Sequence, residues 1–277
     1  MPLQPAATPA RRVWRGLVRA GAIAIGVYAV LVALLWWQQE RLLFVPQVLA
    51  PDHRFEFGAD VHERHVDVPG ARLHALHLKL PAPRGVVFFL HGNSGSLDNW
   101  FVNLEFYRRA NYDLFMFDYR GYGKSGGRIA SEAQLHADAR AAWNALAPEY
   151  AGKKLVLYGR SLGTALAARL GADVQPDLTV LVSPYESMRA LAAELYPWVP
   201  SAALRYPLDT AAAVSRMRKP LWLVHGDADT LIPTRHSQAL KRAQPGATLH
   251  IVRGAGHNDL QEFEDYRAAL RRAFDAI

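Results

Sequence analysis

The stretch YGRSLGT, residues 158–164, places Ser161 between two glycines in the pattern G-x-S-x-G. A serine hydroxyl is a weak nucleophile at neutral pH, so it needs a base to take its proton and a third group to orient that base. Histidine suits the role of base because its unperturbed pKa lies near 6.5. The pattern is short enough to arise by chance. The rest of the chain therefore decides whether Ser161 is a nucleophile or a small residue in a tight turn.

Two later stretches supply a base and an acid. GAGHNDL places His257 on a glycine-bracketed loop, and HGDADTLIP offers Asp227 and Asp229. We expect Asp229 to orient the imidazole because it reaches further from its strand, whereas Asp227 directly follows a turn glycine and is expected to cap its loop. Asp259 is expected to bind the backbone of its loop, and Asp118 to brace its own loop.

Each of these residues follows a stretch that is typical of a strand. Apolar runs alternate with helical patterns, which favours a mostly parallel sheet with right-handed crossovers. Such sheets place their sites at the carboxyl ends of the strands, and the order Ser, Asp, His is typical of them. We predict a hairpin around Pro69-Gly70. The predicted strands are 62–68, 72–80, 85–92, 112–119, 154–159, 178–184, 221–226 and 248–254; the predicted helices are 97–109, 131–146, 162–170, 234–243 and 260–276.

Ser161 thus lies where a strand passes into a helix, the context of a nucleophile elbow. Gly159 and Gly163 are expected there because side chains would collide with the neighbouring strand and helix. An oxyanion that develops on the substrate needs backbone donors. We expect one from the amide of Leu162 and another from Asn93 in the glycine-rich HGNSGS. His91, at the end of its strand beneath that loop, is expected to have a structural hydrogen-bonding role.

The chain at this point resembles the α/β-hydrolase superfamily, in particular the membrane-anchored subgroup that includes the bud-emergence-type proteins and related bacterial hydrolases. The resemblance implies a nucleophile at Ser161, an acid at Asp229, a base at His257 and oxyanion amides at Asn93 and Leu162. Serine rather than aspartate in the elbow argues against the dehalogenase and epoxide-hydrolase branches. The matching stretches, from about residue 38 to residue 260, are QQERLLFVP, FFLHGNSG, FDYRGYGKSGG, LYGRSLGTALA, LVSPYES, VHGDADTLIP and GAGHNDL.

Residues 20–37 form an 18-residue run without a charge. As a helix this run would cover roughly 27 Å, close to the hydrocarbon thickness of a bilayer. The arginines in residues 1–19 predict a cytoplasmic N-terminus and a hydrolase domain on the periplasmic or extracytoplasmic side. A cleaved signal peptide would need small residues just after the run, and WWQQERLLF has none. A buried core helix is the other alternative.

The predicted organisation is therefore a basic N-terminal segment (1–19), a transmembrane anchor (20–37), a juxtamembrane linker (38–50) and an α/β-hydrolase domain (51–277). A small helical cap is expected at residues 185–220. Its apolar side chains are typical of a core, but a cap that faces the membrane would also guide an acyl chain.

Composition excludes several function classes. The net charge of +7 includes four arginines in the first 19 residues, and no basic patch interleaved with aromatics predicts a nucleic-acid partner. Without cysteine there is no disulfide or cysteine-based zinc site. The His62/His65 and His74/His77 pairs lie in predicted strands, where residues three apart face opposite ways, so we expect no metal. No cofactor is implied.

We therefore predict a membrane-anchored serine hydrolase that cleaves carboxylic esters or thioesters, of a small molecule, lipid or acylated protein. A serine aminopeptidase-like peptidase is the first alternative. A non-catalytic binding protein on the same fold is the second.

Overall fold

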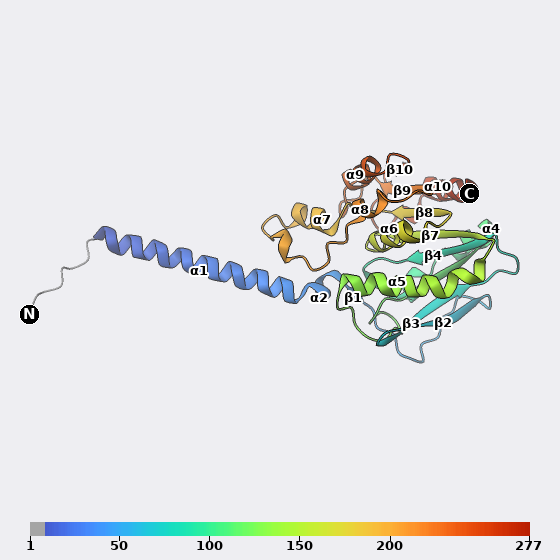
Figure 1. Ribbon diagram of the computed structural model, residues 1–277, viewed down its shortest axis with the longest axis horizontal. Coiled ribbons are helices and arrows are strands. Elements are labelled where there is room, and N and C mark those ends of the chain that lie inside the picture. Colours follow the sequence, from blue (N-terminus) through green and yellow to red (C-terminus); the bar gives the residue numbers. More distant parts are fainter. Residues whose placement is uncertain (1–8) are drawn as a thin grey trace, which may run out of the picture.

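A sheet of eight strands forms the centre of the folded domain, in the order β10-β9-β8-β7-β4-β6-β3-β2 (Figure 1). Only β3 runs antiparallel to its neighbours; the other pairings are parallel. The hairpin β2–β3 closes at Val68 opposite Ala71, as predicted. The strands are β2 (Val61–Val68), β3 (Ala71–Leu78), β4 (Gly85–Leu90), β6 (Tyr112–Phe117), β7 (Lys154–Arg160), β8 (Leu178–Val182), β9 (Leu221–Gly226) and β10 (Thr248–Val252).

Helices cover both faces of this sheet and bury two apolar layers. One layer joins the sheet to α5 (Glu132–Leu146), α6 (Gly163–Val174), α8 (Thr210–Val214) and α9 (Arg235–Ala243). The other joins it to α3 (Leu97–Trp100), α4 (Leu104–Ala110) and α10 (Glu264–Asp275). Because β4, β6 and β8 are buried on both faces, their sequences are continuous apolar runs. Short 3-10 helices occur at η1 (Ala147–Tyr150), η2 (Ser201–Ala203) and η3 (Leu260–Glu262).

The α/β-hydrolase fold predicted from the sequence is confirmed, but two helix predictions are wrong in detail. The segment 97–109 is not one helix: α3 ends at Trp100, and α4 begins only after Asn103, which has a left-handed φ of 59°. Residues 260–276 likewise divide into η3 and α10, because Phe263 between them is extended.

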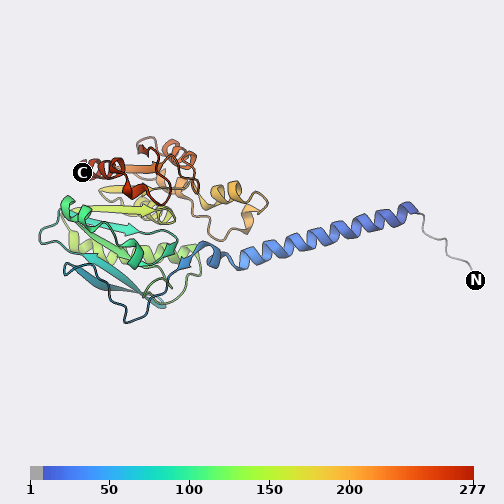
Figure 2. The same ribbon diagram turned by 180° about the vertical axis from the view of Figure 1, so that it is seen from behind.

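This computed structural model describes residues 9–277, so the first eight residues of the predicted segment 1–19 lie outside it. Helix α1 (Pro9–Trp37) projects away from the domain, as both views show (Figures 1 and 2). In the described chain it is the one helix long and apolar enough to cross a membrane, and none of its apolar window is buried. A buried core helix is therefore excluded.

The linker, which we call the connector (residues 38–50), is part of the fold. It contains α2 (Gln39–Leu43) and β1 (Val45–Pro46), and β1 pairs in parallel with β5 (Ser94–Gly95). The aromatic ring of Phe44 is buried in the first apolar layer.

The predicted cap segment also divides in two. Helix α7 (Met188–Leu195) and η2 project beside the end of α1, whereas α8 packs on α6 and α9 with the rest of the domain (Figure 1).

Candidate active site

Ser161 occupies the tight turn between β7 and α6. Its φ of 51° is left-handed, which is rare for a residue with a side chain and typical of a strained functional turn. A Cβ on Gly159 would lie 2.6 Å from the Gly163 carbonyl oxygen, and a Cβ on Gly163 would lie 2.1 Å from that of Leu90. The two glycines thus let α6 pack directly on β7 and on the end of β4, as the sequence pattern requires.

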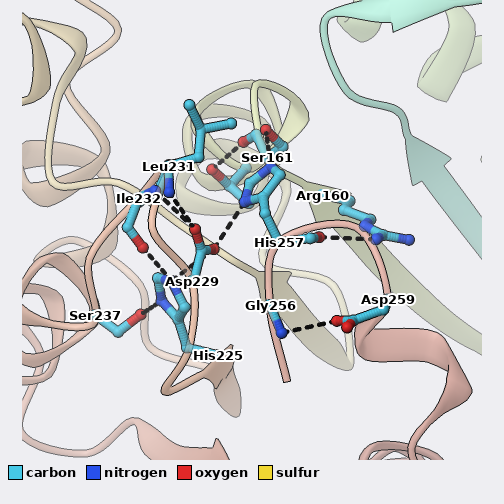
Figure 3. A network of polar contacts seen from close by, with 11 residues as sticks. Arg160, Ser161, His225, Asp229, Leu231, Ile232, Ser237, Gly256, His257 and Asp259 are labelled. Carbon is cyan, nitrogen blue, oxygen red and sulfur yellow. Dashed lines mark hydrogen bonds and ion pairs between the residues drawn. The ribbon is translucent and has the colours of Figure 1, made fainter. Parts of the chain in front are cut away.

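The structure brings Ser161, His257 and Asp229 together at the carboxyl ends of three strands (Figure 3). His257 Nε2 lies 3.0 Å from the Ser161 hydroxyl oxygen, and His257 Nδ1 lies 2.7 Å from a carboxylate oxygen of Asp229. A carboxylate accepts, so Nδ1 carries the proton and Nε2 is left to accept from serine. This is the geometry of a serine nucleophile, a general base and an orienting acid.

Four donors hold the Asp229 carboxylate. The amides of Leu231 and Ile232 donate to one oxygen at 2.9 and 2.8 Å, and the imidazoles of His257 and His225 face the other at 2.7 and 3.2 Å. Burial by itself raises the pKa of Asp229, but the hydrogen bonds from His225, His257 and Ile232 outweigh burial and hold that pKa well below its usual range. Asp229 is therefore ionised at neutral pH.

His225, near the end of β9, also holds the Asp229 carboxylate in place. Its Nε2 lies 2.7 Å from the carbonyl oxygen of Ile232 as well as near Asp229, so Nε2 carries the proton, and Nδ1 accepts from the hydroxyl of Ser237. The role of His225 was not predicted from the sequence. His225 is fully buried, so its ring needs hydrogen-bond partners of its own, and no local sequence pattern shows that Asp229 is one of them.

Asn93 and Leu162 line the cavity beside Ser161. Within residues 9–277 neither of their backbone amides has a protein acceptor, so both are available to a ligand. The carbonyl of Asn93 is held from behind by the hydroxyl of Tyr122 at 2.6 Å and the amide of Val45 at 2.9 Å. The loop that offers the Asn93 amide is thus fixed by FDYRGYGKSGG and by the connector.

His91 is fully buried beneath this loop, and its Nδ1 donates to the carbonyl of Gly92 at 2.8 Å. Burial lowers the pKa of His91 to about 4, so the ring is neutral. Asp118 was expected to brace its own loop. Its carboxyl instead accepts the Leu97 amide, on the neighbouring loop, at 3.1 Å. Burial raises the pKa of Asp118 to about 8, against that hydrogen bond.

Three further polar residues brace the loops around the site. Asp259 accepts the amide of Gly256 and so binds its own loop, as expected. Asp227 was predicted to cap its own loop, but its carboxylate instead accepts the amide of Gly254 on the loop after β10. Arg160, for which the sequence offered only a loop-bracing role, donates to the carbonyl of His257 at 3.1 Å (Figure 3).

A cavity of about 440 Å³ opens above Ser161. Ser161, Asn93 and Leu162 lie at one end, and residues of α1, the connector, α7, the loop after α7 and the loop after β9 form most of the rest of its wall. In the described chain the residues that line it carry no charge, and no cluster of three His, Cys, Asp or Glu could hold a metal ion.

Comparison with known proteins agrees with the fold. The family model described as "Serine aminopeptidase, S33" matches residues 81–208, which include Ser161. The chain is 32% identical over 201 residues to alpha/beta hydrolase domain-containing protein 17C of Xenopus tropicalis, across 69% of this chain and 62% of that protein. It is 31% identical to protein 17B of Xenopus laevis, across 69% of this chain and 67% of that protein. The chain belongs to the α/β-hydrolase superfamily.

Solved structures of other members share this hydrolase's fold. An esterase of Pyrococcus furiosus superimposes with a TM-score of 0.66 at 20% identity, over 84% of this chain and 97% of that chain. A monoacylglycerol lipase of Paleococcus ferrophilus superimposes with a TM-score of 0.59 at 20% identity, over 74% of this chain and 98% of that chain. The chain spans about six tenths of the length of the 17C proteins that it matches.

Proposed function

We propose that this hydrolase cleaves carboxylic ester or thioester bonds through a covalent acyl-enzyme on Ser161. The observation that carries the proposal is the continuous contact from the Ser161 hydroxyl through His257 to Asp229, at 3.0 and 2.7 Å. A lone serine in a turn would not have a base within hydrogen-bond distance that is itself oriented by an ionised carboxylate.

The proposed reaction has two steps. His257 Nε2 takes the Ser161 proton as the oxygen attacks the acyl carbon, and the amides of Asn93 and Leu162 stabilise the oxyanion. The imidazolium, stabilised by Asp229, then protonates the leaving alcohol or thiol. In the second step, His257 takes a proton from water, the hydroxide equivalent attacks the acyl carbon, and Ser161 leaves with that proton restored.

The cavity favours acyl substrates over peptides with a free N-terminus. The description of the matching family model points to an aminopeptidase, which is the second candidate. An aminopeptidase must bind the substrate's ammonium group, which favours a carboxylate in the pocket. Among the described residues that line the cavity there is none, and most are leucine, alanine or aromatic.

The proposal includes a membrane anchor. Helix α1 exposes large apolar side chains along its length, among them Ile23, Val27 and Leu31, and their exposure to water is unfavourable. Four arginines precede its apolar run. Cleavage after the connector would remove Phe44 from the core and β1 from its pairing with β5, which supports an uncleaved anchor. With the arginines in the cytoplasm, the domain lies on the extracytoplasmic side.

A fluorophosphonate probe tests the chemistry directly. The full-length protein in detergent is expected to be labelled, and the Ser161→Ala variant is expected to resist labelling. Equal labelling of the variant would refute Ser161 as the nucleophile. Turnover of aminoacyl-naphthylamides, with none of p-nitrophenyl acyl esters, would favour the aminopeptidase instead.

A further inference from the structure

The outer end of the cap lies against the predicted membrane-spanning helix. We call residues 195–204, LYPWVPSAAL, the cap tip. The hydroxyl of Tyr28, in the middle of the apolar run of α1, donates to the carbonyl of Trp198 at 2.9 Å. Pro200 and Ala203 share a groove with Tyr28 and Val32. The tip therefore sits beside a part of α1 that the proposed anchor places in the bilayer.

The position of this contact sets a depth. Trp37 closes the apolar run, and Tyr28 precedes it by nine residues, or about 13 Å of helix. The tip therefore extends on the order of 10 Å past Trp37 along α1, a depth at which amphipathic segments lie at the boundary of headgroups and acyl chains. Arg205, just after the tip, lies 5.0 Å from the ring of Trp36 and marks the return to polar surface.

The composition of the tip suits that environment. None of its ten residues is charged, and Leu195, Tyr196 and Trp198 are about half exposed although they are large and apolar. Exposed clusters of this kind mark interaction surfaces. Pro197 and Pro200 lack an N–H that lipid would leave unsatisfied.

Several backbone groups of the tip are also hydrogen-bonded within the protein. The Val199 amide donates to Tyr196, and the carbonyl of Ala203 accepts from the side chain of Gln39. The contact with Trp198 likewise satisfies the hydroxyl of Tyr28, which would otherwise lie unpaired in hydrocarbon.

The same tip forms one wall of the cavity above Ser161. Leu195, Tyr196 and Trp198 line the cavity from the cap, and Leu35 and Leu42 line it from the end of α1 and from the connector. The cavity thus runs from a polar end at Ser161 and Asn93 to an apolar end between two elements that face the membrane. That distribution matches a molecule with an ester at one end and an acyl chain at the other.

We infer that the cap tip is inserted in the leaflet beside α1 and that the cavity draws the acyl chain of an ester lipid directly from that leaflet. The inference rests on the proposed serine hydrolase, and it adds the substrate's source and class. The lipid's acyl chain stays in an apolar environment from the bilayer to Ser161, because tip, connector and cavity wall form one apolar path.

Spin labelling tests the insertion independently of catalysis, because the chain has no cysteine of its own. The full-length variant Ser201→Cys carries a label at the tip. The variant Ser215→Cys carries one just after α8, beside the C-terminal end of α6. In phosphatidylcholine vesicles, position 201 is expected to be accessible to oxygen and shielded from a water-soluble nickel chelate, and position 215 the reverse. Equal access of the chelate to both positions would overturn the insertion.

Activity tests the path of the acyl chain. A fluorogenic long-chain ester in vesicles is compared with p-nitrophenyl acetate in water, for the wild type, Trp198→Ser and the control Val102→Ser. Trp198→Ser is expected to lower the ratio of vesicle to acetate turnover roughly tenfold, since an apolar wall is lost. The control, an exposed valine before α4, is expected to leave that ratio unchanged.

The outcomes separate the two proposals. An unchanged ratio in Trp198→Ser, with normal fluorophosphonate labelling, would overturn entry from the leaflet and leave the serine hydrolase standing. A wild type that resists the probe and hydrolyses neither ester would overturn the proposed function itself, and with it the role of the cavity.

Discussion

Two regions of the protein surround one cavity and are built in opposite ways. The carboxyl edge of the sheet, which carries Ser161, Asp229 and His257, is placed by parallel strands whose backbones are hydrogen-bonded to one another. The cap and connector are held together by a few side chains that reach across the sequence. Gln39 bonds the backbone of Ala203 and Arg205, and Glu40 pairs with Arg205 and Tyr206.

The difference separates chemistry from access. A rigid edge keeps a serine, a base and an acid within hydrogen-bond distance, which a small displacement would abolish. The ion pair of Glu40 with Arg205 is partly exposed, with about a quarter of each side chain accessible, so it contributes little stability. Changes at the sheet edge should therefore affect reaction or folding strongly, and changes at the connector should affect substrate delivery mildly.

The largest expected effect is at the acid. Asp229→Asn keeps the shape but favours the wrong tautomer of His257, and kcat is expected to fall about 10⁴-fold, as in serine proteases. The matched control is Asp227→Asn, two residues earlier, whose side-chain amide oxygen can still accept the hydrogen bond from the Gly254 amide. Steady-state turnover of a p-nitrophenyl ester measures both. Similar losses in the two variants would contradict the assignment.

A second effect concerns the packing that places Ser161. A Cβ at Gly163 would lie 2.1 Å from the Leu90 carbonyl oxygen, so Gly163→Ala is expected to lower the free energy of unfolding by about 3 kcal/mol. Gly26→Ala in α1, where no atom lies within 4 Å, is the control. Chemical unfolding in detergent measures both variants. A free energy of unfolding in Gly163→Ala equal to that of the wild type would show that the elbow is not rigidly packed.

Two buried groups beneath the oxyanion loop, His91 and Asp118, make the free energy of unfolding depend on pH. The pKa of His91 is lower in the folded state, at about 4, so the unfolded chain takes up its proton first. The stability that the domain gains from keeping His91 neutral is fully present above pH 6.5 and is lost as the pH falls toward 4. Burial raises the pKa of Asp118 to about 8, so this group makes the free energy of unfolding rise as the pH falls, opposite to His91. A His91 variant is therefore needed to separate the two effects.

The comparison of wild type with His91→Asn isolates that contribution. Between pH 6.5 and 5, the free energy of unfolding of the wild type is expected to fall by about 2 kcal/mol more than that of the variant. Identical pH slopes in thermal unfolding would show that His91 is not held neutral by burial.

The smallest effect is expected at the connector. Glu40→Ala breaks the contacts with Arg205 and Tyr206 and should lower the free energy of unfolding by about 1 kcal/mol or less. Turnover of a vesicle-embedded ester should fall severalfold, because cap and anchor separate. Glu149→Ala, which removes a similar ion pair with Arg64, should leave that turnover unchanged. Equal turnover in both variants would show that the connector does not align the cap.

The sequence predicted the sheet and its strands well because buried parallel strands are continuous apolar runs bounded by turn residues. It also predicted that Ser161, Asp229 and His257 would meet, since each follows a strand of the same sheet. The break at Asn103 was missed because one left-handed asparagine interrupts a pattern that is otherwise helical.

Other features depend on tertiary contacts that no local pattern encodes. The pairing of Val45 with Ser94 joins two-residue strands, which are too short for periodicity. The partner of Asp118 lies on a neighbouring loop, and the support of Asp229 by His225 requires both to be buried together. The contact between Tyr28 and Trp198 spans most of the chain.

The most direct test of the central claim is the mass of the enzyme during turnover. The full-length protein is mixed with a p-nitrophenyl ester, quenched in acid within the first turnover and digested for mass spectrometry. The account predicts one acyl group, on the peptide that contains Ser161, and none in Ser161→Ala. Turnover with the acyl group on another residue, or with no acyl-enzyme and full activity in Ser161→Ala, would contradict it.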